Sequence, residues 1–172
     1  MSLDSYYKDH WVEIEDERLD RYEQMFQWSP AFERLLEPAD IMPGQTVGDL
    51  GCGPGFLTLQ LLERVGPEGH VHSFDVSADF IERTRVKAEA AGLSDRLTLH
   101  HLTGAGLPLA DTVLDRIIAK NVMVYVDDPA ETFREFQRIL KNGGKAHAID
   151  SDFSMVAIDP VPPAEWRALV DA

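Results

Sequence analysis

The ten residues from Thr46 to Gly55 constrain the fold of this chain most, because they join an apolar strand to a glycine-rich loop. Residues 46–50 are short, apolar and bounded by turn residues, which predicts a buried strand. Gly51, Gly53 and Gly55 then allow a tight turn and a close approach of the backbone to a ligand. A helix is expected over 56–65, with its N-terminal amides facing the loop. The stretch therefore predicts either a ligand site or a tight strand-to-helix turn without a ligand.

Composition places the chain among folded domains and restricts its partners. Its 172 residues are 44% apolar, which is enough for one domain with a core. The formal net charge is −14, from 30 acidic and 16 basic residues, and this charge repels phosphate backbones and anionic membrane surfaces. We therefore expect neither a nucleic acid nor a membrane as partner.

Cys52 is the only cysteine, so no internal disulfide can form and a reducing compartment is indicated. Its place inside the glycine loop favours a small filling residue over a reactive thiol. The sequence shows no apolar run long enough to span a bilayer and no secretory leader. We expect a cytoplasmic protein.

An N-terminal helical cap is expected over residues 1–40. Apolar residues recur every three to five positions from Leu3 to Phe26, which is typical of an amphipathic helix. Ser29 and Pro30 then provide an N-cap and a first-turn proline for a short helix that ends near Pro38. This segment precedes the sheet, so it can only lie across one of its faces or edges.

Four further strands alternate with helices after the glycine loop. They are expected at 70–76, 96–102, 115–119 and 145–150. Ser77 can cap the helix after the second strand, and Gly92 can end it. Asp128 can cap a helix that reaches Lys141 and ends at residues 142–144. This alternation predicts an α/β fold, a Rossmann-like parallel sheet with helices on both faces, whose ligand lies beyond the carboxyl ends of the strands.

Two positions near the loop distinguish between classes of nucleotide. Asp75 ends the second strand, 24 positions after Gly51, where a carboxylate can accept hydrogen bonds from the two hydroxyls of a ribose. The alternative role, a cap for the next helix, suits Ser77 better. The dinucleotide fingerprint needs a third glycine where this chain has Phe56. The spacing therefore favours a ribose-containing ligand and argues against a dinucleotide.

Over about residues 40–155 the sequence resembles the class I methyltransferases that use S-adenosylmethionine, in particular the small-molecule methyltransferases of bacteria. Val47–Gly55, which reads VGDLGCGPG, is similar to the family's first motif almost letter for letter, and Phe74–Ser77 is similar to its second. Three further matches follow in the family's order and spacing, at Leu107–Leu109, Asp115–Ile118 and Arg138–Gly144. The resemblance implies methyl transfer from S-adenosylmethionine to a small organic acceptor, with S-adenosylhomocysteine as product. A non-catalytic cofactor-binding relative and a nucleotide-dependent oxidoreductase remain as alternatives.

The resemblance also implies which residues bind the amino-acid part of the cofactor. Gly51 and Gly53 would contact it through their backbone, and Asp49 would organise the loop. Asn121 would line the wall near the methionine part.

The adenosine part would be held by residues after the second and third strands. Asp75 would bind the ribose, and Val76 would pack on the adenine. Many relatives carry an acidic residue for the adenine amino group where this chain has Thr103, Gly104 and Ala105. Adenine recognition would therefore rest on Thr103, on Gly104 or on the backbone.

Methyl transfer needs neither a metal nor an acid in principle, because the sulfonium is already an activated donor that must only be held in line with the acceptor. A base is required where the acceptor must lose a proton. The candidates are His100, His101, Tyr125, Asp150 and Asp152, of which we retain His101, Tyr125 and Asp150.

The histidines do not suggest a metal site. His100 and His101 are strand neighbours, so their side chains point to opposite faces of the sheet. The others, His10, His70, His72 and His147, have no ligand-like spacing. We expect no bound metal.

Aromatic residues near the N-terminus suggest a lid. Members of the family often fold an N-terminal helix over the cofactor, and Tyr6, Tyr7 and Trp11 could cover the sulfonium, which a ring face attracts. The alternative is that these rings are ordinary core.

The family's sheet has seven strands, and this chain offers five. The fifth strand would form an exposed edge, which proteins usually cover. We expect a missing C-terminal segment or the second subunit of a homodimer to cover it. On this interpretation residues 41–155 form the cofactor-binding domain, and residues 156–172 begin a further helix of the same domain that is cut short.

Overall fold

The computed structural model describes residues 11–12, 14–104 and 106–151 of the chain. Within these residues five strands form one sheet in the order β3-β2-β1-β4-β5, and every neighbouring pair is parallel. The strands are β1 (Thr46–Leu50), β2 (His70–Asp75), β3 (Leu97–His101), β4 (Leu114–Lys120) and β5 (Leu140–Ile149). The chain winds from β1 to one edge and then returns to the other side, so the switch point lies between β1 and β4. The expected parallel α/β sheet is confirmed.

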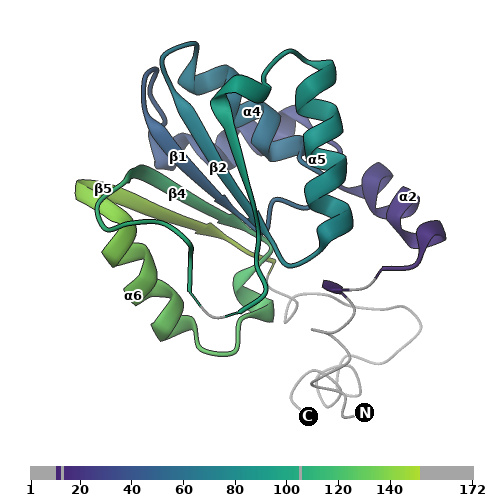
Figure 1. The fold of residues 1–172 in the computed structure, drawn as a ribbon. Helices are drawn as coiled ribbons and strands as arrows, with labels where there is room; N and C mark the ends of the chain where they lie inside the picture. The colour runs from purple at the N-terminus through teal and green to yellow at the C-terminus, as the bar shows by residue number, and fades with distance from the viewer. Residues whose placement is uncertain (1–10, 13, 105, 152–172) are drawn as a thin grey trace.

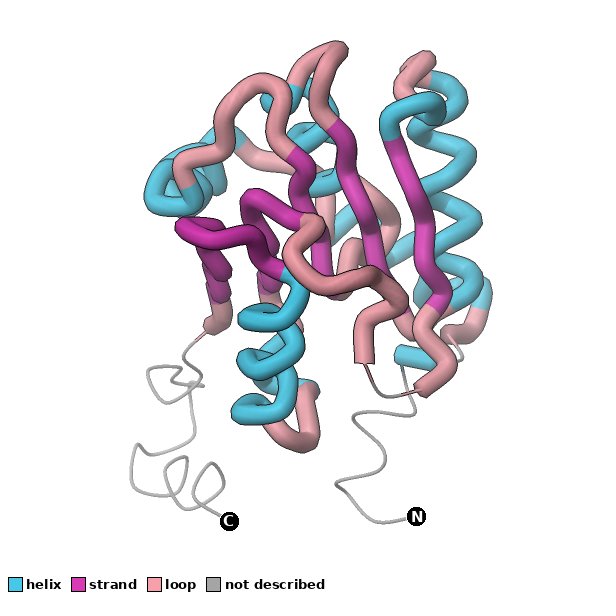
Figure 2. Tube along the Cα trace, turned by 60° about the vertical axis from the view of Figure 1, so that its left-hand side comes forward, coloured by secondary structure: helices cyan, strands magenta, loops and turns pink. Residues whose placement is uncertain are grey.

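Helices cover both faces of this sheet. Figure 1 shows α4 (Phe56–Val65) and α5 (Ala78–Ala90) on one face and α6 (Pro129–Ile139) on the other. Under α4 the core contains Val47, Leu61 and Val71, and under α6 it contains Phe74 and Phe136. Figure 2 shows the strands of the sheet side by side, with helices flanking them. Because successive side chains of a strand point to opposite faces, the strands contribute to two separate apolar cores, one on each face of the sheet.

Local sequence signals fix several boundaries. Strand 46–50 and helix 56–65 begin and end where expected. The hydroxyl of Ser77 accepts a hydrogen bond from the Phe80 amide at 3.4 Å, and the carboxylate of Asp128 accepts one from the Glu131 amide at 2.9 Å. Both residues therefore act as the predicted N-caps. Strand β2 ends one residue earlier than expected, and β4 is longer than expected by one residue at each end.

The prediction of a single amphipathic helix over 3–26 is wrong in the part of this segment that the structure describes. Trp11 and Val12 are helical, Ile14 and Glu15 are not, and α2 (Asp16–Met25) begins after this break. Ile14 is buried with Leu19 and Phe80 of α5, so packing on α5 decides where the chain bends. Helical spacing alone cannot indicate such a bend.

The second N-terminal helix was expected from Pro30 to about Pro38 and is a series of short turns. It consists of η1 (Pro30–Phe32), α3 (Glu33–Leu36) and η2 (Glu37–Ala39). Leu36 and Ala39 are buried in the core under α4, so this segment lies across that face of the sheet, as expected.

The end of α6 and the start of the fifth strand also correct the prediction. The helix stops at Ile139, and Leu140 is already extended and paired with Leu114. Between this pair and the next, Arg116 with Lys145, β4 has one residue and β5 has residues 141–144. Gly143 has a φ of +81°, which favours glycine, so these residues form an irregularity inside β5. The glycines therefore permit a bulge in the strand instead of ending the helix.

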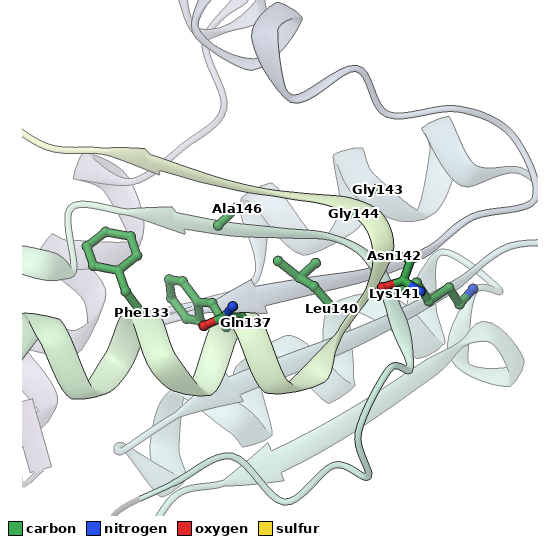
Figure 3. Close-up of a pocket in the computed structure, with 9 residues that line it drawn as sticks. Phe133, Gln137, Leu140, Lys141, Asn142, Gly143, Gly144 and Ala146 are labelled. Atoms are coloured by element: carbon green, nitrogen blue, oxygen red, sulfur yellow. The ribbon is translucent and has the colours of Figure 1, made fainter.

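The edge formed by β5 carries a pocket of about 320 Å³ against α6 (Figure 3). Its lining comprises Phe133, Phe136, Gln137, Ala146 and residues 140–144. The pocket lies at the amino-terminal part of β5, away from the carboxyl ends of the strands. Within the described residues β5 pairs with β4 alone, and what covers its other side stays a prediction. The helices of the described part include none with the length and apolar character needed to cross a membrane.

Candidate cofactor site at the carboxyl ends of the strands

The glycine loop after β1 has a backbone that only glycine adopts easily. Gly51, Gly53 and Gly55 have φ values of +66°, +53° and +87°. A Cβ added at Gly51 would lie 2.3 Å from Cγ2 of Val122, whereas at Gly53 it would meet nothing within 4 Å. The loop is therefore packed against the turn after β4 at Gly51 and faces open space at Gly53.

Asp49 lies beneath the loop as a buried carboxyl group. It is 1% exposed, and its Oδ2 accepts a hydrogen bond from the Thr58 hydroxyl at 2.7 Å. Because that hydroxyl has one proton, the Ser73 hydroxyl, 2.9 Å away, donates to Thr58 in turn. Burial raises the pKa of Asp49 to about 7, and the nearby Asp75 carboxylate adds to this increase. The group thus links β1, β2 and α4 beneath the glycine loop.

Asp75 turns its carboxylate toward the same loop. Its Oδ2 accepts a hydrogen bond from the Gly53 amide at 2.8 Å, and its Oδ1 accepts one from the Ser77 amide at 2.9 Å. Asp75 is 7% exposed, and burial raises its pKa. A carboxylate oxygen can accept more than one hydrogen bond, so the Asp75 carboxylate can also accept from a ligand hydroxyl. The carboxylate that is predicted to bind a ribose thus also holds the glycine loop, and its role toward a ligand stays a prediction.

The amides of the loop are engaged within the protein. Those of Gly51 and Cys52 donate to the Phe74 carbonyl, at 2.8 and 3.0 Å, and that of Gly53 donates to Asp75. A backbone contact from Gly51 to a cofactor would therefore use its carbonyl group. Cys52 is buried, and burial raises the pKa of its thiol, which agrees with a filling role and makes a reactive thiolate unfavourable.

The structure places the other predicted cofactor residues around the loop. Val76 follows β2 and is 40% exposed, although its side chain is apolar. Thr103 and Gly104 lie exposed in the loop after β3. Asn121 follows β4 with a φ of +57°, which is uncommon outside glycine and is often found at functional positions. All four therefore lie after strands β2, β3 and β4, where a ligand of such a sheet binds.

The three candidate bases are not together. Asp150 follows β5, and its carboxylate accepts a hydrogen bond from the Met123 amide at 3.2 Å, next to Tyr125 in η4 (Met123–Tyr125). His101 ends β3, beside Asp75, and its Nε2 lies 3.1 Å from the Val76 carbonyl. Strands β2 and β1 separate β3 from β4, so His101 lies on the side predicted for adenine. Tyr125 and Asp150 form one group, and His101 is apart from it.

Trp11 brings the N-terminal segment to this group. The centre of its ring lies 5.5 Å from the centre of the Tyr125 ring, edge to face, and 5.1 Å from the centre of the Tyr22 ring. Burial raises the pKa of Tyr125, and a hydrogen bond from Trp11 partly opposes this. Tyr6 and Tyr7, the other residues of the proposed lid, lie outside the described residues, as does Asp152.

Sequence reasoning missed a cluster of three histidines. His70 and His72 alternate on β2 and so share a face, and Nδ1 of His72 lies 3.1 Å from Nε2 of His100 on β3. Burial lowers the pKa of His72 to about 4. The His-x-His spacing was visible, but its proximity to His100 depends on strand pairing. Over the described residues, no group of three or more His, Cys, Asp or Glu side chains could hold a metal ion.

Sequence reasoning also missed Lys120. It ends β4, and its ammonium lies 4.5 Å from the centre of the Phe32 ring, in the electrostatic field of Asp49 and Asp150. The available signal was a lysine that follows the apolar residues 117–119 and directly precedes Asn121.

Comparison with known proteins relates this chain mainly to methyltransferases. A family model described as a methyltransferase domain matches residues 41–168. The aklanonic acid methyltransferase DauC of Streptomyces sp. strain C5 is 26% identical over 97% of this chain and 76% of its own length. The biotin biosynthesis bifunctional protein BioHC of Teredinibacter turnerae is 31% identical over 59% of this chain. A solved SAM-dependent methyltransferase from Aquifex aeolicus matches with a TM-score of 0.71 at 22% identity, over 90% of this chain and 81% of that one.

The matched lengths differ widely. The chain spans 18% of the length of BioHC and less than half of the length of two further curated relatives. The likeness to the Aquifex structure establishes the fold, and the family model covers the strands and loops that form the site.

Proposed function

We propose, because this chain belongs to the methyltransferase domain family, that it binds S-adenosylmethionine beyond the carboxyl ends of β1, β2 and β4 and transfers the methyl group to a small organic acceptor. The observation that carries the proposal is the pair of buried carboxyl groups, Asp49 and Asp75, around a glycine loop at the switch point of the sheet. Burial makes both groups costly as anions, and a ligand with positive charge would lower that cost. S-adenosylmethionine carries a sulfonium and an ammonium group, so its charges fit this site.

The loop geometry supports a close ligand. The missing Cβ of Gly53 leaves open space beside an amide that Asp75 already holds in position. We assign the ribose to Asp75, the adenine to Val76 with Thr103 and Gly104, and the methionine part to the wall at Asn121. Asp49 organises the loop through Thr58. These assignments follow the family's motifs, position by position.

The protein contributes positioning to the reaction. The sulfonium of the bound cofactor supplies an activated methyl group. The chain must then hold the acceptor in line with that methyl group and exclude water, which is the main source of rate acceleration in such a transfer. Tyr125 and Asp150 lie together on the side predicted for the methionine part. The Asp150 carboxylate can receive a proton from the acceptor, whereas burial keeps the Tyr125 phenol protonated, so Tyr125 can only donate a hydrogen bond there. His101 lies beside Asp75 and Val76, and we assign it no role in proton transfer.

The proposed acceptor class is a small organic molecule. DauC, which matches nearly the whole of this chain, is named for methylating aklanonic acid. The net charge of −14 disfavours nucleic acid as an acceptor. The aromatic group of Trp11, Tyr22 and Tyr125 offers ring faces and edges to an apolar acceptor or to the sulfonium.

Two measurements test this proposal. Titration calorimetry should detect binding of S-adenosylhomocysteine and none of NAD, and the Asp75→Asn variant should bind S-adenosylhomocysteine at least about tenfold more weakly, since a charged hydrogen-bond acceptor is lost. Tritium from methyl-labelled cofactor should then appear in products of a mixed small-molecule extract. Binding of NAD instead would support an oxidoreductase, and cofactor binding without transfer would support a non-catalytic relative. The exposed Asp79→Asn variant is the matched control.

A further inference from the structure

Lys120 differs from the other lysines that the structure describes. Lys87, Lys141 and Lys145 each form an ion pair with a carboxylate, to Glu23, Asp115 and Asp40 respectively. Among the described residues no carboxylate lies within 4.0 Å of the Lys120 ammonium, although the residue is partly buried. A partly buried ammonium without a direct counter-ion is unfavourable unless a ligand supplies one.

The position of Lys120 connects it with the site. It is the last residue of β4, one position before Asn121, and it projects from the same face of the sheet as Asp49 because Ile118, two residues earlier, pairs with Asp49. The Phe32 ring, 4.5 Å from the ammonium, limits the directions in which the side chain can turn. The ammonium is therefore held near the end of the sheet where the glycine loop lies.

The charges around Lys120 alternate. Burial lowers its pKa, and the carboxylates of Asp49 and Asp150 oppose this by favouring the charged form. Two acidic groups thus flank one cation at the ends of β1, β4 and β5. A zwitterionic amino-acid group presents the complementary arrangement, with a carboxylate for the lysine and an ammonium for the exposed Asp150, while the buried Asp49 acts on the ligand only through its field.

We propose that the Lys120 ammonium binds the α-carboxylate of the amino-acid part of the cofactor, and this assignment rests on the proposed function. Lys120 is then a binding residue that distinguishes cofactors with a carboxylate from analogues without one. The contact is a charge-assisted hydrogen bond in a partly desolvated site, for which the expected effect on affinity is about 10- to 100-fold.

The test compares two ligands that differ only in the carboxylate. Calorimetric affinities of S-adenosylhomocysteine and of its decarboxylated analogue, which keeps the amine, are measured for the wild type and for Lys120→Met. The wild type should prefer S-adenosylhomocysteine at least about tenfold, and the variant should reduce that preference to below about threefold. Lys120→Arg keeps the charge and should retain most of the preference. Lys141→Met, which removes a lysine paired at the opposite end of the sheet, should leave it unchanged.

The outcomes separate this inference from the proposed function. A wild type that binds neither ligand contradicts the proposed function, and the inference with it. A preference that persists in Lys120→Met contradicts the inference alone. An equal loss of affinity for both ligands also contradicts it, because Lys120 would then act only on the structure of the site. If Lys120→Met does not fold, as judged by circular dichroism, Lys120→Gln provides the same comparison.

Discussion

Replacing Asp49 by asparagine should make the protein relatively more stable as the pH rises. Burial raises the pKa of Asp49 from 3.8 to about 7, and repulsion by Asp75 acts in the same direction, while the Thr58 hydrogen bond and Lys120 oppose it. The folded protein therefore holds this proton more tightly than the unfolded chain does. The stability that comes from the neutral carboxyl group is fully present below pH 3.8 and is lost as the pH rises through 7.

The magnitude follows from the difference between the two pKa values. A shift of about 3 units, at about 1.4 kcal/mol per unit, corresponds to about 4 kcal/mol lost in full at alkaline pH. About 2.5 kcal/mol of this loss falls between pH 5 and pH 8. Asparagine keeps an oxygen that can accept the Thr58 hydrogen bond and does not titrate. The free energy of unfolding of Asp49→Asn, relative to the wild type, should therefore rise by about 2.5 kcal/mol from pH 5 to pH 8.

Urea unfolding followed by tryptophan fluorescence measures this quantity. The free energy of unfolding of both proteins is measured at pH 5 and at pH 8, and the variant is compared with the wild type at each pH. The contributions of other titrating groups then cancel, and a cost of the substitution that does not depend on pH does not affect the change between the two pH values. Asp115→Asn is the matched control. Hydrogen bonds from Lys141 and Thr46 overcome burial and lower the pKa of Asp115, so the free energy of unfolding of this variant relative to the wild type should be the same at pH 5 and pH 8. A constant difference for Asp49→Asn as well would refute the reasoning, because it would mean that Asp49 is ionised in the folded protein throughout.

Two further predictions concern the loop and the histidine cluster. Gly51→Ala should destabilise the protein by about 2 kcal/mol or more, because it combines a positive φ with a clash against Val122, whereas Gly53→Ala should cost only about 1 kcal/mol for its φ; equal melting temperatures for the two variants would contradict this. His72→Gln should gain stability relative to the wild type as the pH falls from 7 to 4. Burial and the neighbouring histidines lower the pKa of His72 to about 4 in the folded protein. The wild type therefore loses stability as the pH falls from 6.5 to 4, and the glutamine variant does not share this loss. Melting curves at both pH values measure this, and an unchanged difference would count against it.

The sequence alone determined the centre of the fold. Strand 46–50, the glycine loop and helix 56–65 could be predicted because each depends on signals within about ten residues: an apolar run, glycines with positive φ and helical spacing. The caps Ser77 and Asp128 are equally local. The position of Asp75 at the end of β2 followed from the same boundaries. The hydrogen bond that Asp75 accepts from the Gly53 amide could not be predicted in this way, because it joins the ends of two different strands.

The tertiary structure decided every feature that depends on which strands and helices lie next to each other. The bend at Ile14 depends on packing against Phe80, and the irregularity at residues 141–144 depends on the pairing of β5 with β4. Lys120 comes near Asp49 because β4 pairs with β1, although some 70 residues separate them in the sequence. Local propensity acts over a few residues and carries no information about such pairs, whereas burial of the two apolar faces of the sheet selects one strand order and thereby brings these charges together.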